Sequence, residues 1–344
     1  PSEDVTSANG SYLRRRRATT PRNYVGPIVR RYNDFVFRRQ PESPQVDEDS
    51  LYGLIVQDAD GYGTTLPTLL RGLLRHAQID GVSYCEVSTN RPKSEEQLSM
   101  ADQKARGYRY LVRAINTDSV VKTRYEGQAL AEALIAMYND DGQPVVRLYS
   151  SASVTEWQTD EDHNVVVSSG KTWSHGFAGM PIIAMAPAYD SADESQAAPL
   201  AEHQKTIYNL LSLLSQETWD NTFTQWVLFG ITKEQAGEGG ISYGSNRLFC
   251  VPNAQGRMEK IGADVAQADS IRAYISAEIS ETYRTAGVEA GSPEGSGQAE
   301  SGIARAFKFN DLNANLSAMG DAVELVWNAI MRLVYATAGV TYPG

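Results

Sequence analysis

Three long amphipathic helices are predicted in the second half of the chain, and they constrain the fold more than any other feature of the sequence. In each of these segments, large apolar residues recur every three or four positions, which places them along one face of a helix. The first segment has about 30 residues, so its helix would be about 45 Å long at 1.5 Å per residue. The three segments run from Pro199 to about Phe229, from Asp264 to Ala286, and from about Ile303 to Thr337.

The segments between these helices are polar and rich in glycine. Residues 230 to 263 form a compact insertion, in which Asn253 to Gly256 predict a short hairpin. Gly287 follows the second helix and is expected to end it. The loop "GSPEGSGQAESG", residues 291 to 302, then leads into the third helix, where we expect the polar run "NDLNAN" and Gly320 to cause a bend.

The first half predicts both helices and strands, so the fold class is α+β with an antiparallel component. A helix is expected from about Asn23 to Phe37. The turn "DADGYG" leads into a second helix, which carries leucines 66, 69, 70, 73 and 74 on one face and ends at Asp80 and Gly81. The predicted strands are "VSYCEV", "YRYLVRAI", "VVKTRYE", "PVVRLYS", "SVTEW", "NVVVSS" and "PIIAMAP".

Length and composition point to a soluble globular chain. The 344 residues are enough for one large domain or two ordinary ones. The longest apolar runs are far shorter than the roughly 20 residues that cross a bilayer, so no membrane partner is expected. No secretory signal is visible, and because Pro1 is not a natural start, we expect residues to be missing upstream. Cys85 and Cys250 lie in separate apolar runs, which predicts buried free thiols and neither a disulfide framework nor a thiolate zinc site.

Charge is distributed unevenly along the chain. Residues 1 to 40 contain nine arginines and three acidic residues, a local charge of +6, whereas the whole chain carries −11. The most basic run is Arg14, Arg15, Arg16 and Arg17. Such an arm could bind polyanions or could pack on a neighbour's acidic surface, and the charge pattern favours neither.

Two short motifs are similar to nucleotide and calcium sites but lack essential parts. "SSGKT" at 168 to 172 resembles the end of a phosphate loop, yet Val165 stands where the first glycine is needed and the flanks predict strands. A solvated hairpin turn explains it better. "DADGYG" at 58 to 63 has its glycine at the fourth position rather than the sixth, and Leu69 stands in place of the glutamate of a calcium loop, so we expect a helix-entry turn.

Other catalytic patterns are missing as well. The four histidines, 76, 163, 175 and 203, include no pair at the i, i+4 spacing of a helical metal site. No G-x-S-x-G elbow occurs, and the acidic run at Asp160, Glu161 and Asp162 is typical of a solvated turn. The sequence therefore predicts no catalytic residues, no metal site and no cofactor, and it favours a structural role.

The order of these parts resembles the portal, or head-to-tail connector, proteins of tailed bacteriophages. The resemblance covers nearly the whole chain and rests on "NGSYLRRRRATTPRNYVGPIVRRYNDFVFRRQP", on "DADGYGTTLPTLLRGLLRHAQIDGVSYCEV", and on the passage from "MPIIAMAPAYD" into the first long helix. The chain departs from the family at "VTYPG", where portals usually continue into a C-terminal crown, so the crown is absent or not included.

The resemblance implies a division of the chain into a wing, a stem and a clip. Residues 1 to 198 and 301 to 344 would form the wing, the latter with its long helix. Residues 199 to 229 and 264 to 287 would be the two stem helices, with an α/β clip at 230 to 263 between them. Residues 288 to 300 would be the tunnel loop, hinged at Gly287 and Gly302 and projecting into the bore of a ring of about twelve copies.

The composition of this loop suits a channel through which duplex DNA moves. Lysine or arginine at these positions would release counterions from phosphates and hold the DNA. Acidic groups repel phosphate instead, short polar side chains form bonds that break easily, and glycines allow the loop to follow the duplex. The candidate channel residues are Ser292, Glu294, Ser296, Gln298 and Glu300.

The expected partners follow from the same resemblance. They are further copies of the chain, the DNA in the channel, the large subunit of the terminase that acts as packaging ATPase, adaptor or tail proteins, and the major capsid protein. The protein would not itself be an enzyme, and its location would be the portal vertex of the virion, after assembly in the bacterial cytoplasm. Arg14 to Arg17 are expected outside the channel, against capsid, neighbouring subunit or external DNA.

Two alternative functions remain open. One is another ring-forming virion protein, such as a tail adaptor, and the other is a metal-dependent hydrolase or nuclease with an acidic site. For the ring, we expect Tyr208, Leu213, Tyr274 and Ala277, which lie off the main apolar stripes, to contact neighbouring copies.

Overall fold

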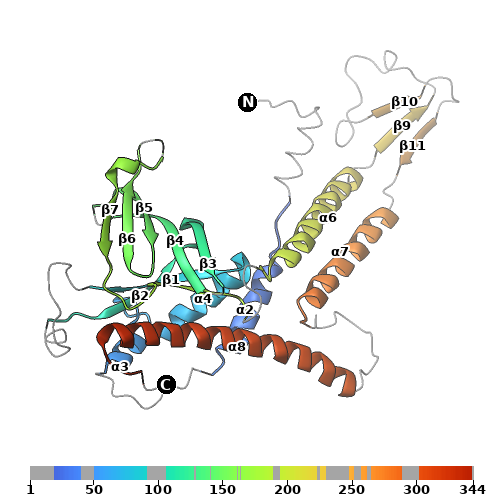
Figure 1. The fold of residues 1–344 in the computed structure, drawn as a ribbon. Helices are drawn as coiled ribbons and strands as arrows, with labels where there is room; N and C mark the ends of the chain where they lie inside the picture. Colours follow the sequence, from blue (N-terminus) through green and yellow to red (C-terminus); the bar gives the residue numbers. More distant parts are fainter. Residues whose placement is uncertain are drawn as a thin grey trace. The chain divides into compact units, whose positions relative to one another are not determined.

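The computed structural model describes most of the chain, which divides into two compact units. The larger unit comprises residues 26–198 and 297–344, and the smaller comprises residues 1–25 and 199–296. Six α-helices and three β-sheets lie in the described residues, so the fold is α+β (Figure 1). The described residues are 19–39, 50–90, 106–188 without 128, 140, 161 and 163, then 194–222, 225–229, 248–251, 257–261, 265–288 and 302–342.

A three-stranded antiparallel sheet lies at the centre of the larger unit. Its strand order is β2-β1-β8, with Cys85 of β1 paired with Ala114 of β2 and with Ile183 of β8. Cys85 and Val87 are fully buried on one face of β1, and Tyr84 is buried on the opposite face. A strand with two buried faces belongs to a middle layer. The bounds are Ser83–Thr89 for β1, Tyr110–Ile115 for β2 and Ile182–Met185 for β8.

A five-stranded antiparallel sheet packs against the Tyr84 face of β1. Its strands follow one another in sequence order, β3-β4-β5-β6-β7. Tyr84 and Ile182 share a hydrophobic cluster with Ala133, Ile135 and other residues of this second sheet. The bounds are Val120–Glu126 for β3, Ala129–Tyr138 for β4, Pro144–Tyr149 for β5, Ser153–Gln158 for β6 and Lys171–Ser174 for β7.

Helices cover the other face of the three-stranded sheet, because their apolar stripes need a surface to bury them (Figure 1). The five leucines predicted for the second helix are all buried. That helix starts at the N-cap Thr65 and ends at Gly81, whose φ of 87° is accessible to glycine at little cost. The helices of this unit are α2 at Val25–Val36, whose first residue belongs to the smaller unit, α3 at Leu51–Gln57, α4 at Leu66–Asp80 and α8 at Gly302–Ala338.

Two buried amide side chains and a methionine connect α2, α4 and α8. Asn33 Nδ2 donates to Gln78 Oε1 at 2.6 Å, and Gln78 Nε2 donates to the sulfur of Met319 at 3.4 Å. Asn33 and Gln78 are 3% and 1% exposed. Asn33 Oδ1 is buried and accepts no hydrogen bond from the described residues. Hydrogen bonding to Gln78 therefore offsets only part of the cost of burying this amide.

The smaller unit contains two long helices and a small sheet. α6 spans Ala198–Thr222, its first residue belonging to the larger unit, and α7 spans Val265–Thr285. Between them in sequence lie β9 at Gln225–Phe229, β10 at Leu248–Val251 and β11 at Arg257–Ile261, in the order β10-β9-β11.

Several predicted elements are confirmed and others are wrong. The helices expected at 23–37, 264–286 and 303–337 correspond to α2, α7 and α8. The first long helix ends at Thr222 instead of Phe229, because residues 225–229 form β9, which pairs with two other strands. The hairpin at 253–256 is wrong, since β10 and β11 both pair with β9 and not with each other. "NVVVSS" contains one isolated bridge and the short 3-10 helix Val167–Ser169 instead of a strand.

Candidate functional site

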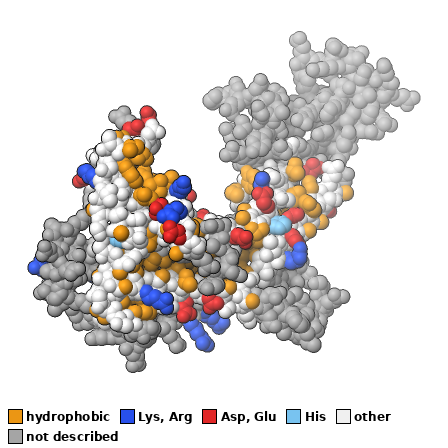
Figure 2. Space-filling view, viewed as in Figure 1, with side chains coloured by type: hydrophobic (Ala, Val, Ile, Leu, Met, Phe, Trp, Pro, Cys, Tyr) orange, Lys and Arg blue, Asp and Glu red, His pale blue; other side chains and the backbone are white. Residues whose placement is uncertain are grey.

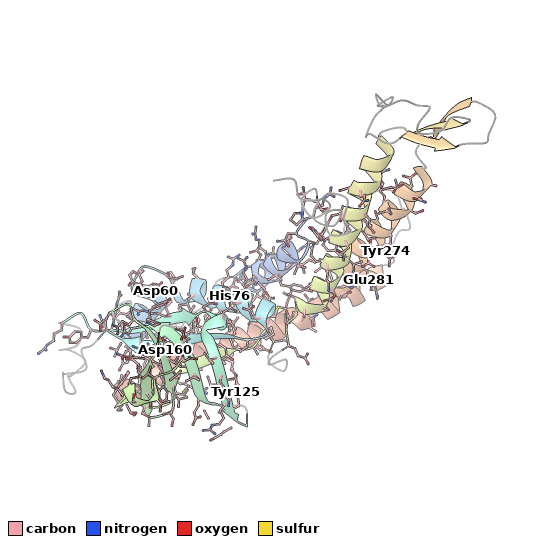
Figure 3. The ribbon with its side chains drawn as sticks, turned by 90° about the horizontal axis from the view of Figure 1, so that it is seen from above. Asp60, His76, Tyr125, Asp160, Tyr274 and Glu281 are labelled. Carbon is pink, nitrogen blue, oxygen red and sulfur yellow. The ribbon has the colours of Figure 1, made fainter. Side chains whose placement is uncertain are left out.

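The long helices α6 and α7 lie side by side and antiparallel (Figures 1 and 3). His203, near the start of α6, contacts two residues in the second half of α7: Nδ1 lies 3.0 Å from Glu278 Oε2, and Nε2 lies 3.5 Å from Thr285 Oγ1. Ile207, one turn beyond His203, and Ile275, one turn before Glu278, are both buried. One face of each helix therefore holds a polar contact beside a buried isoleucine.

The outer faces of this helix pair carry exposed apolar and small side chains. Leu213 is 44% exposed and Tyr274 is 54% exposed, and Ala277 is exposed too. Tyr208, the fourth candidate for a subunit contact, is half-buried. Three of the four residues expected at a subunit contact are thus accessible on α6 and α7, among them Tyr274 (Figure 3).

The end of α7 has the geometry expected of a helix stop. Gly287 has a φ of 65°. Its N–H donates to the carbonyl of Arg284 at 2.9 Å, and the N–H of Val288 donates to the carbonyl of Tyr283 at 3.0 Å. This left-handed ending is open to glycine without a steric cost. Beside it, the hydrogen bond from Arg284 lowers the pKa of the Glu281 carboxyl.

The proposed tunnel loop begins just after this stop. Gly302, the second expected hinge, is the first residue of α8. Ser292, Glu294, Ser296, Gln298 and Glu300 lie outside the described residues. Their position in the channel stays a prediction, whereas their position in sequence, between the end of one long helix and the start of another, is given by α7 and α8.

The basic arm is described only in its last part. Arg14 to Arg17 lie outside the described residues. The segment that follows them contacts α6, because Tyr24 N donates to Gln204 Oε1 at 2.8 Å and Gln204 Nε2 donates to the carbonyl of Arg22. The described arginines of residues 1–40 are all exposed: Arg22, Arg30, Arg31, Arg38 and Arg39.

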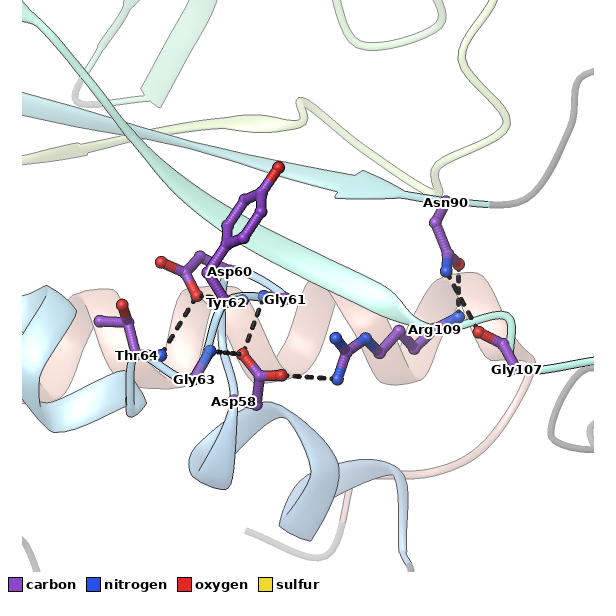
Figure 4. A network of polar contacts seen from close by, with 9 residues as sticks. All are labelled: Asp58, Asp60, Gly61, Tyr62, Gly63, Thr64, Asn90, Gly107 and Arg109. Atoms are coloured by element: carbon purple, nitrogen blue, oxygen red, sulfur yellow. Dashed lines mark hydrogen bonds and ion pairs between the residues drawn. The ribbon is translucent and has the colours of Figure 1, made fainter.

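The "DADGYG" segment is the helix-entry turn that the sequence predicts. Asp58 Oδ1 accepts hydrogen bonds from the backbone N–H groups of Gly61 and Gly63, at 2.8 and 2.9 Å. Asp58 Oδ2 pairs with Arg109 at 2.8 Å (Figure 4). Asp60 accepts from Tyr62 and Thr64, and these hydrogen bonds lower its pKa. The oxygens that a calcium ion would need are thus used to close the turn and lead into α4.

The other motifs are also explained by local structure. In "SSGKT", Ser169 ends the 3-10 helix and Lys171 begins strand β7, so no helix follows the glycine as a phosphate loop requires. His76 is exposed beside Asp80, and His175 Nε2 lies 3.0 Å from the carbonyl of Ser150. His163 lies outside the described residues.

A polar network that the sequence did not suggest lies between the two sheets of the larger unit. Tyr149 of β5 donates to Glu86 Oε1 of β1 at 3.0 Å, and Arg147 Nε pairs with Glu156 Oε2 of β6 at 2.7 Å. Burial raises the pKa of Glu86, although Tyr149 and the charges of Arg147 and Arg113 act in the opposite direction. The register pairs Glu86↔Arg113 and Arg147↔Glu156 would have indicated these neighbours, but only once the strands were aligned.

Two other classes of site, metal centres and membrane spans, are not found in the described residues. No group of three or more His, Cys, Asp or Glu side chains in this part of the chain is placed to hold a metal ion. Among the described helices, none combines the length and the hydropathy needed to span a bilayer.

Comparison of the whole sequence with models of protein families and with curated proteins finds no match. The basis for a function is therefore the order of the elements and the chemistry of their surfaces.

Proposed function

We propose that this chain is the portal subunit of a tailed bacteriophage: a non-enzymatic protein that forms a closed ring and conducts double-stranded DNA into and out of the capsid. In this proposal α6 and α7 are the stem, the segment from β9 to β11 is the clip, and residues 288 to 300 line the channel. The terminase motor would dock on the clip during packaging, and adaptor or tail proteins would dock there afterwards.

The observation that supports this proposal most is the order of elements from α6 to α8. Two antiparallel helices of 25 and 21 residues, about 37 and 31 Å long, are separated in sequence by a three-stranded sheet. A glycine stop and a polar segment follow, and then a helix of 37 residues. A helical pair with an insertion at its far end suits a long, narrow assembly better than a compact catalytic domain.

The surface of the helix pair is compatible with a ring. Exposed Leu213 and Tyr274 supply apolar contact area on opposite members of the pair. A cyclic ring uses a head-to-tail contact, in which one face of a subunit meets a different face of the next. Exposed apolar residues on both helices of the pair are compatible with such a contact.

The charge of the loop supports the channel role. Between Gly287 and Gly302 the chain has three glutamates and no lysine or arginine. Repeated around a ring, these carboxylates repel phosphate and leave few counterions to be released, so DNA is not held. A loop with several lysines would bind the duplex and stop its movement.

The test is the mass of the intact assembly of the full chain. For a ring of about twelve copies of this 37.7 kDa chain, native mass spectrometry should give about 450 kDa. Negative-stain images of the same sample should show a ring with a central opening. A monomer or dimer at micromolar concentration would contradict the proposal, and metal-dependent cleavage of duplex DNA by the purified chain would favour the nuclease alternative.

A further inference from the structure

A cleft of about 750 Å³ opens between the two sheets of the larger unit. One wall comes from the end of β2 and the turn that follows it, including Ile115, Asn116 and Ser119. The other wall comes from β4 and β5, including Met137 and Val145. This volume is within the range of sites that receive a ligand or a few side chains of a partner.

The lining of the cleft is mostly apolar, and several of its residues are exposed. Val121 is 61% exposed, Tyr138 is 74% exposed and Val165 is 43% exposed. Hydrophobic side chains also reach the surface over the five-stranded sheet in the space-filling view (Figure 2). Apolar side chains gathered at an open cleft are typical of an interaction site rather than of an ordinary surface.

Acidic turns directly adjoin the residues that line the cleft. Asp118 lies between the lining residues Asn116 and Ser119, and Asp141 lies in the turn between Tyr138 and Pro144. Asp160, which is labelled in Figure 3, and Asp162 lie in the turn between Thr159 and Val165. All four aspartates are exposed and, within the described part of the chain, none of them forms an ion pair.

Two basic residues near the cleft do not cancel this charge. Arg113 lines the cleft opposite Glu86 in the pairing of β1 with β2, so the two are close enough for their charges to offset each other. Lys122, next to Val121 on β3, is exposed and leaves the four aspartates in excess. The site is therefore an apolar cleft with a negatively charged rim, which fits a segment with apolar residues directly beside basic ones.

We propose that this cleft receives the basic arm, residues 12 to 17, of a second copy of the chain. The arm has the required order, since Tyr12 and Leu13 directly precede Arg14 to Arg17. Tyr12 and Leu13 would fill the apolar cleft while the arginines face the aspartates at its mouth. This inference rests on the proposed ring, because each arm needs a neighbouring copy. The arm's partner is then the neighbouring subunit, and not capsid or DNA.

The test measures binding of a labelled peptide of residues 10 to 19 by fluorescence anisotropy. The host is the full chain with Arg14→Ser, Arg15→Ser, Arg16→Ser and Arg17→Ser, so that its own arms do not compete. We expect saturable binding that weakens with added salt. Peptides with the four arginines changed to glutamine, or with Tyr12 and Leu13 changed to serine, should each bind at least about tenfold more weakly.

Substitutions in the host then locate the site. Tyr138→Ser and Val121→Ser should each weaken binding about three- to tenfold, and Asp141→Asn about threefold. Tyr62→Ser is the matched control, since Tyr62 is 85% exposed and does not line the cleft, and it should leave binding unchanged. All these side chains are exposed, so the variants should keep the thermal unfolding midpoint of the host within about 2 °C.

The outcomes separate this inference from the proposed function. Equal peptide affinity for the host, Tyr138→Ser and Val121→Ser would overturn the cleft proposal, as would arm-dependent binding of duplex DNA with no binding of the peptide. The mass of the wild-type assembly is measured in parallel. A ring without peptide binding contradicts only the inference, whereas peptide binding by a chain that forms no ring contradicts only the portal proposal.

Discussion

Tyr149 and Glu86 join the two sheets of the larger unit through a hydrogen bond, with 3.0 Å between the phenol oxygen and Oε1 of the carboxyl group. Burial makes ionisation of Glu86 unfavourable and raises its pKa, while the bond from Tyr149 stabilises the charged form. Burial and the charge of Glu86 raise the pKa of Tyr149 too, so the phenol keeps its proton at neutral pH and remains the donor.

The first prediction concerns the pH dependence of stability. Below the ordinary glutamate pKa of 4.5, Glu86 is protonated in both the folded and the unfolded state. As the pH rises towards the raised pKa of the folded state, the unfolded state loses its proton first, and the free energy of unfolding falls. Glu86→Gln should remove this loss, so its stability relative to wild type should increase from pH 4 to pH 7. Urea unfolding of both proteins at several pH values gives their free energies of unfolding and so measures this difference.

Tyr149→Phe provides the complementary variant. Without the phenol, the carboxylate loses a donor, so the loss of stability with pH should become larger than in wild type. The substitution should also lower the free energy of unfolding by about 1 kcal/mol, the usual contribution of one hydrogen bond. A pH profile identical to wild type in both variants would mean that Glu86 does not titrate as the geometry indicates.

Arg147 should be more important for stability than the more exposed Arg124. The Arg147 side chain is 21% exposed, pairs with Glu156, and has its guanidinium 5.9 Å from the ring centre of Trp173. Arg147→Ala leaves Glu156 without its cation, and we expect a loss of about 2 kcal/mol. Arg124 is 49% exposed and pairs with Glu126 and Glu132, so Arg124→Ala should cost below about 1 kcal/mol. If chemical unfolding shows equal losses of stability in Arg147→Ala and Arg124→Ala, burial does not explain the importance of Arg147.

Because Asn33 and Gln78 are hydrogen-bonded to each other, we expect their substitutions to have non-additive effects on the free energy of unfolding. Gln78→Leu removes the closer of two acceptors of Asn33 Nδ2, the other being the Val29 carbonyl at 3.2 Å, and should lower the free energy of unfolding by about 1–3 kcal/mol, because the asparagine stays buried. Asn33→Leu in addition removes the amide that needs partners, including the Oδ1 already without a donor in the described residues. The double variant should therefore be more stable than Gln78→Leu alone. Additive losses would show that the two amides do not depend on each other.

The channel proposal predicts that basic residues in the loop slow or stop DNA. Glu294→Lys with Glu300→Lys should increase the affinity of the assembled ring for duplex DNA at least about tenfold at 0.1 M salt, with a steeper salt dependence, because each added cation can release counterions. Filter binding over a series of salt concentrations measures both quantities.

The control for this charge change is Glu126→Lys with Glu202→Lys. Both side chains are exposed, at 68% and 78%, and they give the same net charge outside the loop. DNA affinity in this control should change by less than about threefold. If both double variants bind DNA equally tightly, total charge explains the result and the loop has no special position.

Helix formation was largely predictable from the sequence. The stripe of five leucines on α4 and that of α8 from Met319 to Val334 are local patterns, and the predicted faces are buried. The stops at Gly81 and Gly287 were predictable for the same reason, since a left-handed residue after a helix depends on the glycine alone. The antiparallel strands β2, β3, β5 and β6 were found from their β-branched and aromatic residues.

Strand β4 could not be found in this way. "ALAEALIAMY" consists mainly of residues that favour helices, yet it forms the ten-residue strand between β3 and β5. Two flanking strands supply hydrogen bonds along both of its edges, and this tertiary pairing outweighs the local preference. The reverse occurs at "NVVVSS", where the residues favour a strand but the described structure contains one bridge and a 3-10 helix.

Local sequence patterns are enough to predict most of the helices, their buried faces, their glycine stops and the basic character of the arm, because each depends on residues a few positions apart. Long-range pairing and packing set where α6 ends, which strands pair with β9, and that Glu86 contacts Tyr149, which is 63 residues away in the sequence. They also bring residues next to three separate acidic turns to one apolar cleft. Contacts of this range depend on how sheets align and pack, and no local spacing in the chain encodes that alignment.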